Sequence, residues 1–333
     1  PLLDRIPMRL ADAMLSMLRP ADTGLRDWID ARLSSYAGSA GAILGDPLIE
    51  SMYRWQSGER TVGELEADGT LQASFVESLE HASGDYRFPR DRRLFTHQLA
   101  ALKSTSAGKS ILVSAGTGAG KTESFLFPIL NDLCQQSVDS KAALEGVQAL
   151  FIYPLNALIR SQKERLVAWL EAHEGRHRFA LYNGDMKNSL PADNRRKFPL
   201  SEVPDRERLR QSPPPLLITN TTMLELMLVR PDDRPILEKS AGKLRWIVID
   251  EAHSYTGSQA AELTLLLRRT LQAFNVNPHD VRFIATSATI GDQSEESTSA
   301  LKKFLADVAG CDEDQVDVIR GHREIPALGA LAG

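Results

Sequence analysis

The sequence is short of the features that mark secreted and membrane proteins. Its 333 residues include two cysteines, Cys134 and Cys311, which lie far apart and outside any metal-ligand spacing. We expect both to be reduced structural thiols in a cytoplasmic protein. No apolar run approaches the roughly 20 residues that a bilayer span needs, so no membrane partner is expected. The chain opens on Pro1 without the flanks of a secretory signal, which suggests a segment excised from a longer protein.

An excess of positive charge is also missing. The sequence has 39 Lys and Arg residues against 44 Asp and Glu residues, a net charge of −5. This balance argues against a uniformly basic nucleic-acid coat, although it does not exclude a local basic groove. The hydrophobic fraction of 42% and charged fraction of 25% are ordinary for a globular protein. Composition alone therefore leaves the function open.

Two kinds of periodicity divide the chain. Residues 1–88 carry apolar positions at helical spacing, broken by Gly and Pro, and predict a mainly helical accessory region. Over residues 89–333, short continuous apolar runs alternate with helical stretches, which predicts an α/β domain: a mostly parallel sheet with helices on both faces. Residues 199–215, rich in Pro and charge, are expected to form an exposed loop. The expected strands are residues 111–114, 149–153, 178–182, 216–219, 245–250 and 282–287.

A glycine-rich turn follows the first expected strand. The string AGTGAGKT leads directly into a helical stretch, a context that favours a phosphate-binding loop over an ordinary turn. Its backbone N–H groups can converge on phosphate oxygens at the helix N-terminus. Lys121 would reach the β- and γ-phosphates of ATP, and the Thr122 hydroxyl would ligate Mg²⁺. The expected nucleotide-binding residues here are Ala115, Gly116, Thr117, Gly118, Ala119, Gly120, Lys121 and Thr122.

A pair of acidic residues ends another expected strand. The string RWIVIDEAH places Asp250 and Glu251 at the carboxyl end of an apolar run, where open parallel sheets bind ligands. Asp250 could hold Mg²⁺, while Glu251 could polarise the water that attacks the γ-phosphate. An isolated acidic pair carries little information. Together with the phosphate loop, this pair predicts the second half of one Mg–ATP site.

The two motifs together resemble those of superfamily-2 DExH-box helicases. The string DEAH at residues 250–253 is similar to motif II of that superfamily, whose phosphate loop also commonly opens on Ala. The resemblance implies a RecA-like P-loop NTPase domain that uses ATP and Mg²⁺. It implies that Gln98 reads the adenine edge, and that Ser287 and Thr289 couple nucleotide state to nucleic-acid binding. It also implies catalytic roles for Lys121, Asp250, Glu251 and His253.

Further strings resemble the DNA-repair helicases of the mitomycin-repair type and the related large phage-defence helicases of bacteria. These strings are LFTHQLAAL, YPLNALIRSQ, YNGD and ITNTTMLELML. Residues of this kind position a nucleic-acid backbone without reading its sequence, although polar residues at such places also cap helices. Leu155 and Asn156 depart from the Thr-Lys pair usual in the subgroup. The resemblance implies DNA-backbone contacts by Pro154, Leu155, Asn156, Gly184, Thr219 and Asn220.

The resemblance favours the first motor domain of an ATP-dependent DNA helicase or translocase, acting in anti-phage defence or DNA repair. The alternatives are a restriction-type duplex translocase, an RNA helicase, and a nucleotide-gated nucleic-acid-binding or assembly module that works with defence-system proteins. Motors of this superfamily close the ATP site with arginines of a second RecA-like domain, whose motif has no match here. We expect that domain elsewhere in the parent chain, and we expect this segment alone to hydrolyse ATP poorly and not to unwind DNA.

Overall fold

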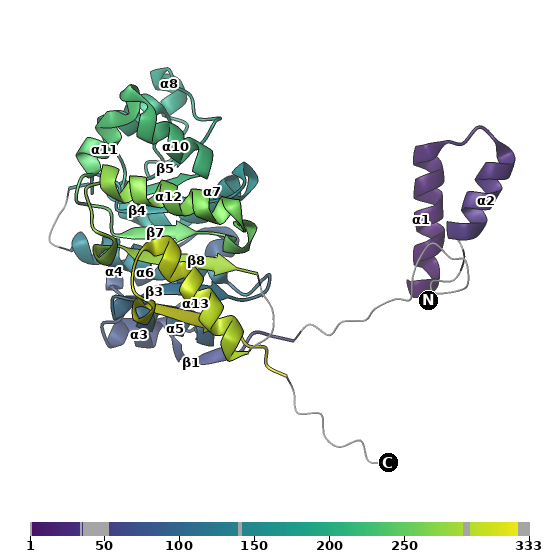
Figure 1. Cartoon of the computed structure of the whole chain (residues 1–333), viewed down its shortest axis with the longest axis horizontal. Helices are drawn as coiled ribbons and strands as arrows, with labels where there is room; N and C mark the ends of the chain where they lie inside the picture. The colour runs from purple at the N-terminus through teal and green to yellow at the C-terminus, as the bar shows by residue number, and fades with distance from the viewer. Residues whose placement is uncertain (1, 34, 36–52, 139–141, 289–293, 326–333) are drawn as a thin grey trace, which may run out of the picture. The chain divides into compact units, whose positions relative to one another are not determined.

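The chain folds into two compact units, Pro1–Tyr53 and Arg54–Gly333. The computed structural model describes residues 2–33, 35, 53–138, 142–288 and 294–325. The first unit contains two helices, α1 (Leu2–Leu18) and α2 (Thr23–Leu33), which match the helical spacing of apolar residues there (Figure 1). Within the described ranges, no helix combines the length and apolar character that crossing a membrane requires.

The second unit is built on a sheet of seven strands in the order β5-β6-β4-β7-β8-β3-β9 (Figure 1). All neighbouring pairs are parallel, as the alternation of strands and helices predicts. The six expected strands are confirmed, each within one residue at either end, and β9 adds an edge strand. The bounds are β3 (Ser110–Ser114), β4 (Ala149–Ile152), β5 (Phe179–Tyr182), β6 (Leu216–Thr219), β7 (Trp246–Ile249), β8 (Arg282–Ser287) and β9 (Val316–Arg320).

Helices cover both faces of this sheet. On one side lie α3 (Val62–Ala67), α4 (Ala73–Glu80), α5 (Thr96–Ser106), α6 (Lys121–Gln136) and α7 (Asn156–Leu170). On the other lie α9 (Arg206–Gln211), α10 (Thr221–Val229), α11 (Arg234–Ser240), α12 (Ser258–Ala273) and α13 (Glu295–Ala309). Successive strand residues point to opposite faces of the sheet: Ile111 packs with the first group of helices and Leu112 with the second. Strands covered in this way need apolar residues at every position, which explains their continuous apolar runs.

The segment before residue 89 belongs partly to the second unit, unlike the expected boundary. There β1 (Ser57–Thr61) pairs antiparallel with β2 (Arg93–Phe95), and α4 packs against α6. The ring centroids of Phe75 and Phe88 lie 5.4 Å and 5.2 Å from that of Phe127 in α6. These aromatic contacts remove large apolar surfaces from water, so the second compact unit begins at Arg54.

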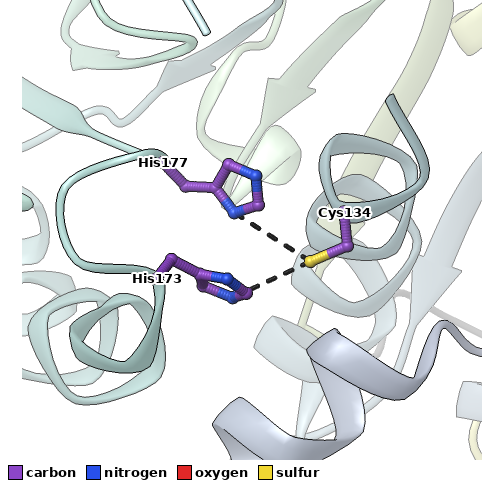
Figure 2. Close-up of side chains that lie close together, drawn as sticks. All are labelled: Cys134, His173 and His177. Atoms are coloured by element: carbon purple, nitrogen blue, oxygen red, sulfur yellow. Dashed lines mark hydrogen bonds between the residues drawn. The ribbon is translucent and has the colours of Figure 1, made fainter. Parts of the chain in front are cut away.

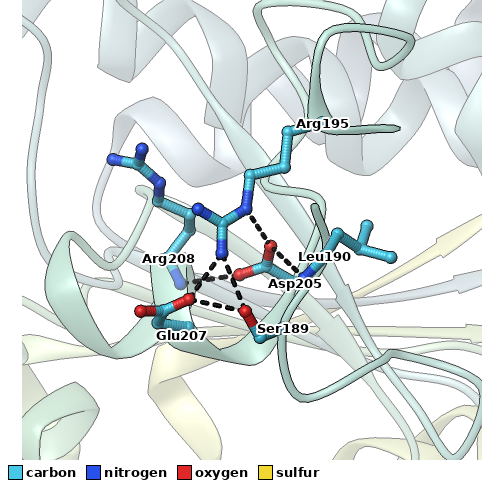
Figure 3. Close-up of polar contacts among 6 residues, drawn as sticks. All are labelled: Ser189, Leu190, Arg195, Asp205, Glu207 and Arg208. Atoms are coloured by element: carbon cyan, nitrogen blue, oxygen red, sulfur yellow. Dashed lines mark hydrogen bonds and ion pairs between the residues drawn. The ribbon is translucent and has the colours of Figure 1, made fainter. Parts of the chain in front are cut away.

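The expectation of an exposed loop over residues 199–215 is wrong, because α9 lies within it. Asp205 caps this helix by accepting from the backbone N–H of Arg208 at 2.9 Å, and Leu209 is buried. Asp205 is itself 0% exposed and also accepts from Arg195 Nε at 2.6 Å and the Leu190 N–H at 3.2 Å (Figure 3). The prolines and charged residues around this helix are typical of loops, so the sequence pattern does not predict its start. Arg195, from the basic run 194–198, is therefore an ion-paired structural residue.

Replacing Asp205 with alanine is expected to destabilise the protein. Loss of the helix cap alone costs about 1 kcal/mol, and Arg195 and the Leu190 N–H also lose their acceptor (Figure 3). The matched control is Glu207→Ala, which removes the second carboxylate on Arg195; that side chain is 48% exposed. Water screens this exposed ion pair and can hydrate Arg195 in its absence, so the control should lose much less stability. Urea unfolding compares the two variants, and equal losses would contradict the structural role of Asp205.

Candidate active site

The glycine-rich turn joins the end of β3 to the start of α6, as expected. Gly118 and Gly120 have φ angles of 71° and 69°, in the left-handed region that residues with side chains rarely adopt. A Cβ atom at Gly120 would lie 2.5 Å from Gln98 Nε2, so a side chain there would also displace the Gln98 amide. The first N–H groups of α6 lack intrahelical acceptors and point out of its N-terminus. The turn therefore has the geometry of a phosphate cradle.

Two side chains at the start of α5 hold this turn. His97 Nε2 lies 2.7 Å from the Ala119 carbonyl oxygen; a carbonyl only accepts, so this nitrogen carries the proton. Burial lowers the pKa of His97, which favours the neutral ring. Gln98 donates to the Gly120 carbonyl oxygen at 3.0 Å and accepts from the Phe95 N–H at 2.9 Å. Sequence reasoning missed His97, whose only signal is its place beside Gln98. The adenine contact of Gln98 stays a prediction.

The acidic pair follows β7, at the same sheet edge as the phosphate loop. Lys121 Nζ lies 3.8 Å from Glu251 Oε1, so motifs far apart in sequence meet here. Glu251 adopts φ 51° and ψ 47°, a left-handed conformation that is strained for a residue with a side chain. Thr286 supports it: its hydroxyl accepts from the Glu251 N–H at 3.2 Å and donates to Asp250 Oδ1. Sequence reasoning missed Thr286, which immediately precedes Ser287.

The electrostatics of the acidic pair suit a divalent cation. Burial raises the pKa of Asp250; the adjacent Glu251 charge adds to this, whereas the Thr286 hydroxyl and Lys121 oppose it. Glu251 Oε2 is buried without a hydrogen-bond partner in the described part of the chain. A divalent cation would supply the positive charge that these carboxylates lack, and Mg²⁺ prefers oxygen ligands. The residues therefore fit Mg²⁺, with Asp250 and Thr122 as its expected protein ligands.

Replacing Asp250 with asparagine is expected to raise the melting temperature of the metal-free protein while removing ATP hydrolysis. The asparagine oxygen can still accept the Thr286 hydroxyl, but it carries no charge into a buried site. The pKa of Asp250 in the folded state lies above its ordinary 3.8, so ionisation weakens the fold as pH rises through that value. The gain in melting temperature of the variant over the wild type should be full at neutral pH and should vanish in acid, where Asp250 is protonated. Each kcal/mol gained corresponds to about 2–4 °C.

Thermal unfolding without Mg²⁺ or nucleotide, at neutral and acidic pH, measures this effect. A lower melting temperature for the variant at neutral pH would contradict the destabilising role of the ionised carboxylate.

His253, in the short helix η4 (Ala252–Ser254), connects the acidic pair to the end of β8. Its Nδ1 lies 3.2 Å from Glu251 Oε2 and accepts from the Ala288 N–H at 3.4 Å. The Ser287 carbonyl oxygen in turn accepts from the Ala115 N–H at 3.2 Å. Ser287 is 1% exposed, while Thr289, the other expected coupling residue, lies outside the described residues. The end of β8 and the residue after it thus contact both motifs, and their coupling role stays a prediction.

The expected nucleic-acid contacts lie on the adjacent half of the same sheet edge. Residues 154–156 follow β4, Gly184 lies two residues after β5 and Asn220 follows β6, and these three strands are neighbours. Asn220 Nδ2 donates to Asn156 Oδ1 at 2.8 Å, which joins the ends of β6 and β4. Leu155, Asn156 and Gly184 are exposed, and Pro154 is partly exposed. The strand order therefore separates the strands that carry the phosphate loop and the acidic pair (β7, β8, β3) from those that precede the expected polymer contacts (β5, β6, β4).

Thr219 differs from its expected place on the surface. It is 0% exposed, and its hydroxyl donates to the Tyr182 carbonyl oxygen at 2.7 Å, because β6 is covered on both faces. The side chain thus aligns the ends of β5 and β6 and presents no hydroxyl to a ligand. Asn220 accepts from the Met223 N–H at 2.8 Å and so caps α10, the alternative role for such residues. Asn156 and Gly184 stay the more accessible predicted contacts.

Comparison with known sequences agrees with this geometry. Residues 95–297, more than half of the chain, match the DEAD/DEAH box helicase family. The Druantia protein DruE of Escherichia coli (strain UMEA 4076-1) is 27% identical over 326 residues, which covers 70% of this chain and 18% of DruE. The uncharacterized ATP-dependent helicase YprA of Bacillus subtilis (strain 168) is 26% identical over 202 residues, covering 61% of this chain and 24% of YprA. The chain thus spans about a fifth to a quarter of these relatives.

Solved structures share the fold. The DUF1998 helicase MrfA bound to DNA has a TM-score of 0.53 at 24% identity, over 76% of this chain and 30% of MrfA. The DEAD-box helicase Mss116 bound to ssRNA and UDP-BeF has a TM-score of 0.57 at 17% identity, over 80% of this chain and 46% of Mss116. The parallel sheet with helices on both faces is therefore the RecA-like helicase fold. With its family match over residues 95–297, the chain belongs to the DEAD/DEAH box helicase family.

Proposed function

We propose that this chain is the first motor domain of an ATP-dependent DNA helicase or translocase that acts in anti-phage defence or DNA repair. The observation that supports the motor most strongly is the meeting of Lys121 and Glu251 at 3.8 Å, between the phosphate loop and the DEAH motif. A helicase domain of this family implies nucleotide binding. The defence or repair setting rests on the resemblance to DruE and MrfA and belongs to the whole protein, of which the chain covers a part.

Each polar group near the phosphate loop and the acidic pair has a proposed task. Lys121 and the N–H groups at the start of α6 bind the β- and γ-phosphates. Asp250 and Thr122 would hold Mg²⁺, which would supply positive charge against the phosphate oxygens. Glu251 orients the attacking water and accepts its proton, and the strained backbone at this residue fixes the direction of the carboxylate. Gln98 contacts adenine from its place beside Gly120.

The second half of the sheet edge is proposed to hold the DNA backbone. Exposed polar and main-chain groups at Asn156 and Gly184 can donate to phosphate oxygens without reading sequence. The hydrogen bond from Asn220 fixes the Asn156 amide, so this contact is preorganised. Ser287, the last residue of β8, accepts from the Ala115 N–H of the phosphate loop. Together with Thr289 it would transmit the nucleotide state to this half. We propose that movement of the segment at the end of β8 against those that follow β4, β5 and β6 couples the nucleotide state to DNA binding.

A charge change at Asn156 tests the polymer contact. In the parent protein, Asn156→Asp should raise the DNA concentration needed for half-maximal ATPase stimulation about tenfold, through repulsion of phosphate. The matched control is Gln272→Glu, which also converts an exposed amide into a carboxylate. Gln272 lies near the C-terminal end of α12, away from the predicted polymer contacts. Steady-state phosphate release is measured with matched DNA and RNA strands. Equal shifts in both variants would contradict the contact, and stimulation by RNA alone would replace DNA with RNA as the substrate.

A further inference from the structure

Three buried side chains far from the nucleotide site converge on one point. Cys134 lies near the end of α6, His173 ends the short helix η2 (Glu171–His173), and His177 lies just before β5 (Figure 2). Cys134 Sγ is 3.7 Å from His173 Nε2 and 3.9 Å from His177 Nδ1, and the three atoms lie within 4.8 Å of one another. The residues are 1%, 3% and 1% exposed. Cys134 lies 39 residues before His173 in the sequence, so the spacing of residues along the chain does not predict that these side chains meet.

We propose that Cys134, His173 and His177 form a zinc-binding site that joins the end of the phosphate-loop helix α6 to the connection between α7 and β5. Thiolate and imidazole are the ligands that zinc prefers, and three protein ligands leave one tetrahedral position for water. Zn–S bonds of about 2.3 Å and Zn–N bonds of about 2.0–2.1 Å place tetrahedral S and N atoms about 3.6 Å apart. The sulfur–nitrogen separations in this structure exceed that value by only a few tenths of an ångström.

The hydrogen bonds around His177 leave the required nitrogen free of a proton. The Ser137 hydroxyl donates to the Cys134 carbonyl oxygen at 3.0 Å, because that oxygen can only accept. The same hydroxyl lies 2.9 Å from His177 Nε2 and therefore accepts the proton of that nitrogen. His177 Nδ1 then carries a lone pair and faces the sulfur (Figure 2). An outer hydrogen bond that fixes the imidazole tautomer is characteristic of metal-bound histidines.

Burial acts in opposite directions on the two kinds of ligand. It raises the pKa of Cys134 to about 12, which disfavours the thiolate, and lowers the pKa of His173 to about 4 and of His177 to about 3, which favours the neutral imidazoles that bind metal. The thiol forms its S–Zn bond by releasing one proton to solvent. The nearby Arg176 charge opposes the cation but favours the thiolate, so its two effects partly cancel.

The site is separate from the proposed Mg–ATP site. Cys134 lies 13 residues after Lys121 in the same helix, which corresponds to about 20 Å at 1.5 Å per residue. Zinc would therefore act on stability, by fixing the end of α6 against the segment that leads into β5. The phosphate cradle sits at the opposite end of this helix. Nucleotide binding should persist without zinc, so the zinc proposal and the motor proposal fail independently.

Zinc titration of the 333-residue chain tests the proposal. The protein is stripped with a chelator, dialysed and titrated with Zn²⁺ alone, and bound metal is measured by mass spectrometry. We expect about one zinc per chain and a higher melting temperature with zinc. With Co²⁺ in its place, thiolate-to-metal charge-transfer absorption should appear. Failure of the wild-type chain to bind zinc, with no change in melting temperature, would overturn the site without any variant having to fold.

Matched variants identify the ligands. Cys134→Ser and His177→Gln should lower bound zinc below about 0.1 per chain, because each removes one of three ligands. The controls are Cys311→Ser, a change at the second cysteine, and His81→Gln, a change at an exposed histidine. Both controls should retain the full stoichiometry. Full zinc binding by Cys134→Ser would also overturn the proposal, and binding of a fluorescent ATP analogue reports that each variant is folded.

Discussion

Replacing Lys121 with alanine is expected to lower the ATP turnover of the parent protein by at least about 100-fold, as for loss of a transition-state charge contact. The Lys121 side chain is 12% exposed and lies 3.8 Å from Glu251, so water cannot readily replace its charge at the phosphates. Alanine also leaves the Glu251 carboxylate and the bound phosphates without this cation, which should abolish detectable MgATP binding. Steady-state phosphate release with saturating DNA measures the loss, and strand displacement should fall with it.

The control for this prediction is Lys103→Ala, at an exposed lysine in α5. It should leave turnover within about twofold of the wild type, since exposed charges away from a site contribute little. The Lys121→Ala variant also distinguishes the motor proposal from the alternative of a nucleotide-gated assembly module. If strand separation survived in Lys121→Ala while assembly with defence-system proteins failed, ATP would organise partners and the motor proposal would be wrong.

The elements that the sequence predicts well are those with local signals. Strands β3, β6 and β8 carry continuous apolar runs bounded by turns, and a sheet covered on both faces demands such runs. The phosphate loop is equally local: its glycines lie between a strand and a helix, and positive φ angles at Gly118 and Gly120 require glycine. Because parallel strands end at one edge, the meeting of Lys121 with Glu251 also follows from strand order.

The features that sequence reasoning missed depend on tertiary contacts. Thr286 differs from any strand threonine only because the fold places its hydroxyl between Asp250 and the Glu251 N–H. Thr219 matches a surface motif in sequence, yet it ends a strand buried on both sides and faces the Tyr182 carbonyl. The buried histidines near Cys134 come from another part of the chain. Contacts between residues far apart in the sequence leave no local pattern, so they are seen only in the folded chain.

The sheet edge places the two proposed ligand sites on neighbouring strand ends. β7 carries Asp250 and Glu251 and borders β4, whose following residues are the predicted polymer contacts. The side chain of His253 touches Glu251 and the segment after β8, so a change at the γ-phosphate has a short path into the neighbouring loops. The proposed hydrolysis and the predicted polymer contacts thus involve adjacent strand ends. Rearrangement of those ends is the physical coupling that the motor proposal requires.

This chain alone should turn over ATP about 10³–10⁵-fold more slowly than the parent protein, since that is the contribution of an arginine finger to phosphoryl transfer. Among the described residues, Lys121 Nζ and His253 Nδ1 lie within 4 Å of the Glu251 carboxylate, and no arginine does. The relatives are several times longer than the matched region, which leaves room for a second RecA-like domain that closes the site. MgATP binding should remain measurable, because the phosphate cradle lies within this chain.

Phosphate release by equal amounts of the chain and the parent, each with saturating DNA, gives the ratio. Binding of a fluorescent ATP analogue to the chain is the control for folding, and Lys121→Ala in the same chain should abolish that binding. A turnover within about tenfold of the parent would contradict the need for an arginine from outside. In that case, a charged group of this chain would have to stabilise the transition state, and Lys121 would be the first residue to examine because it already contacts Glu251.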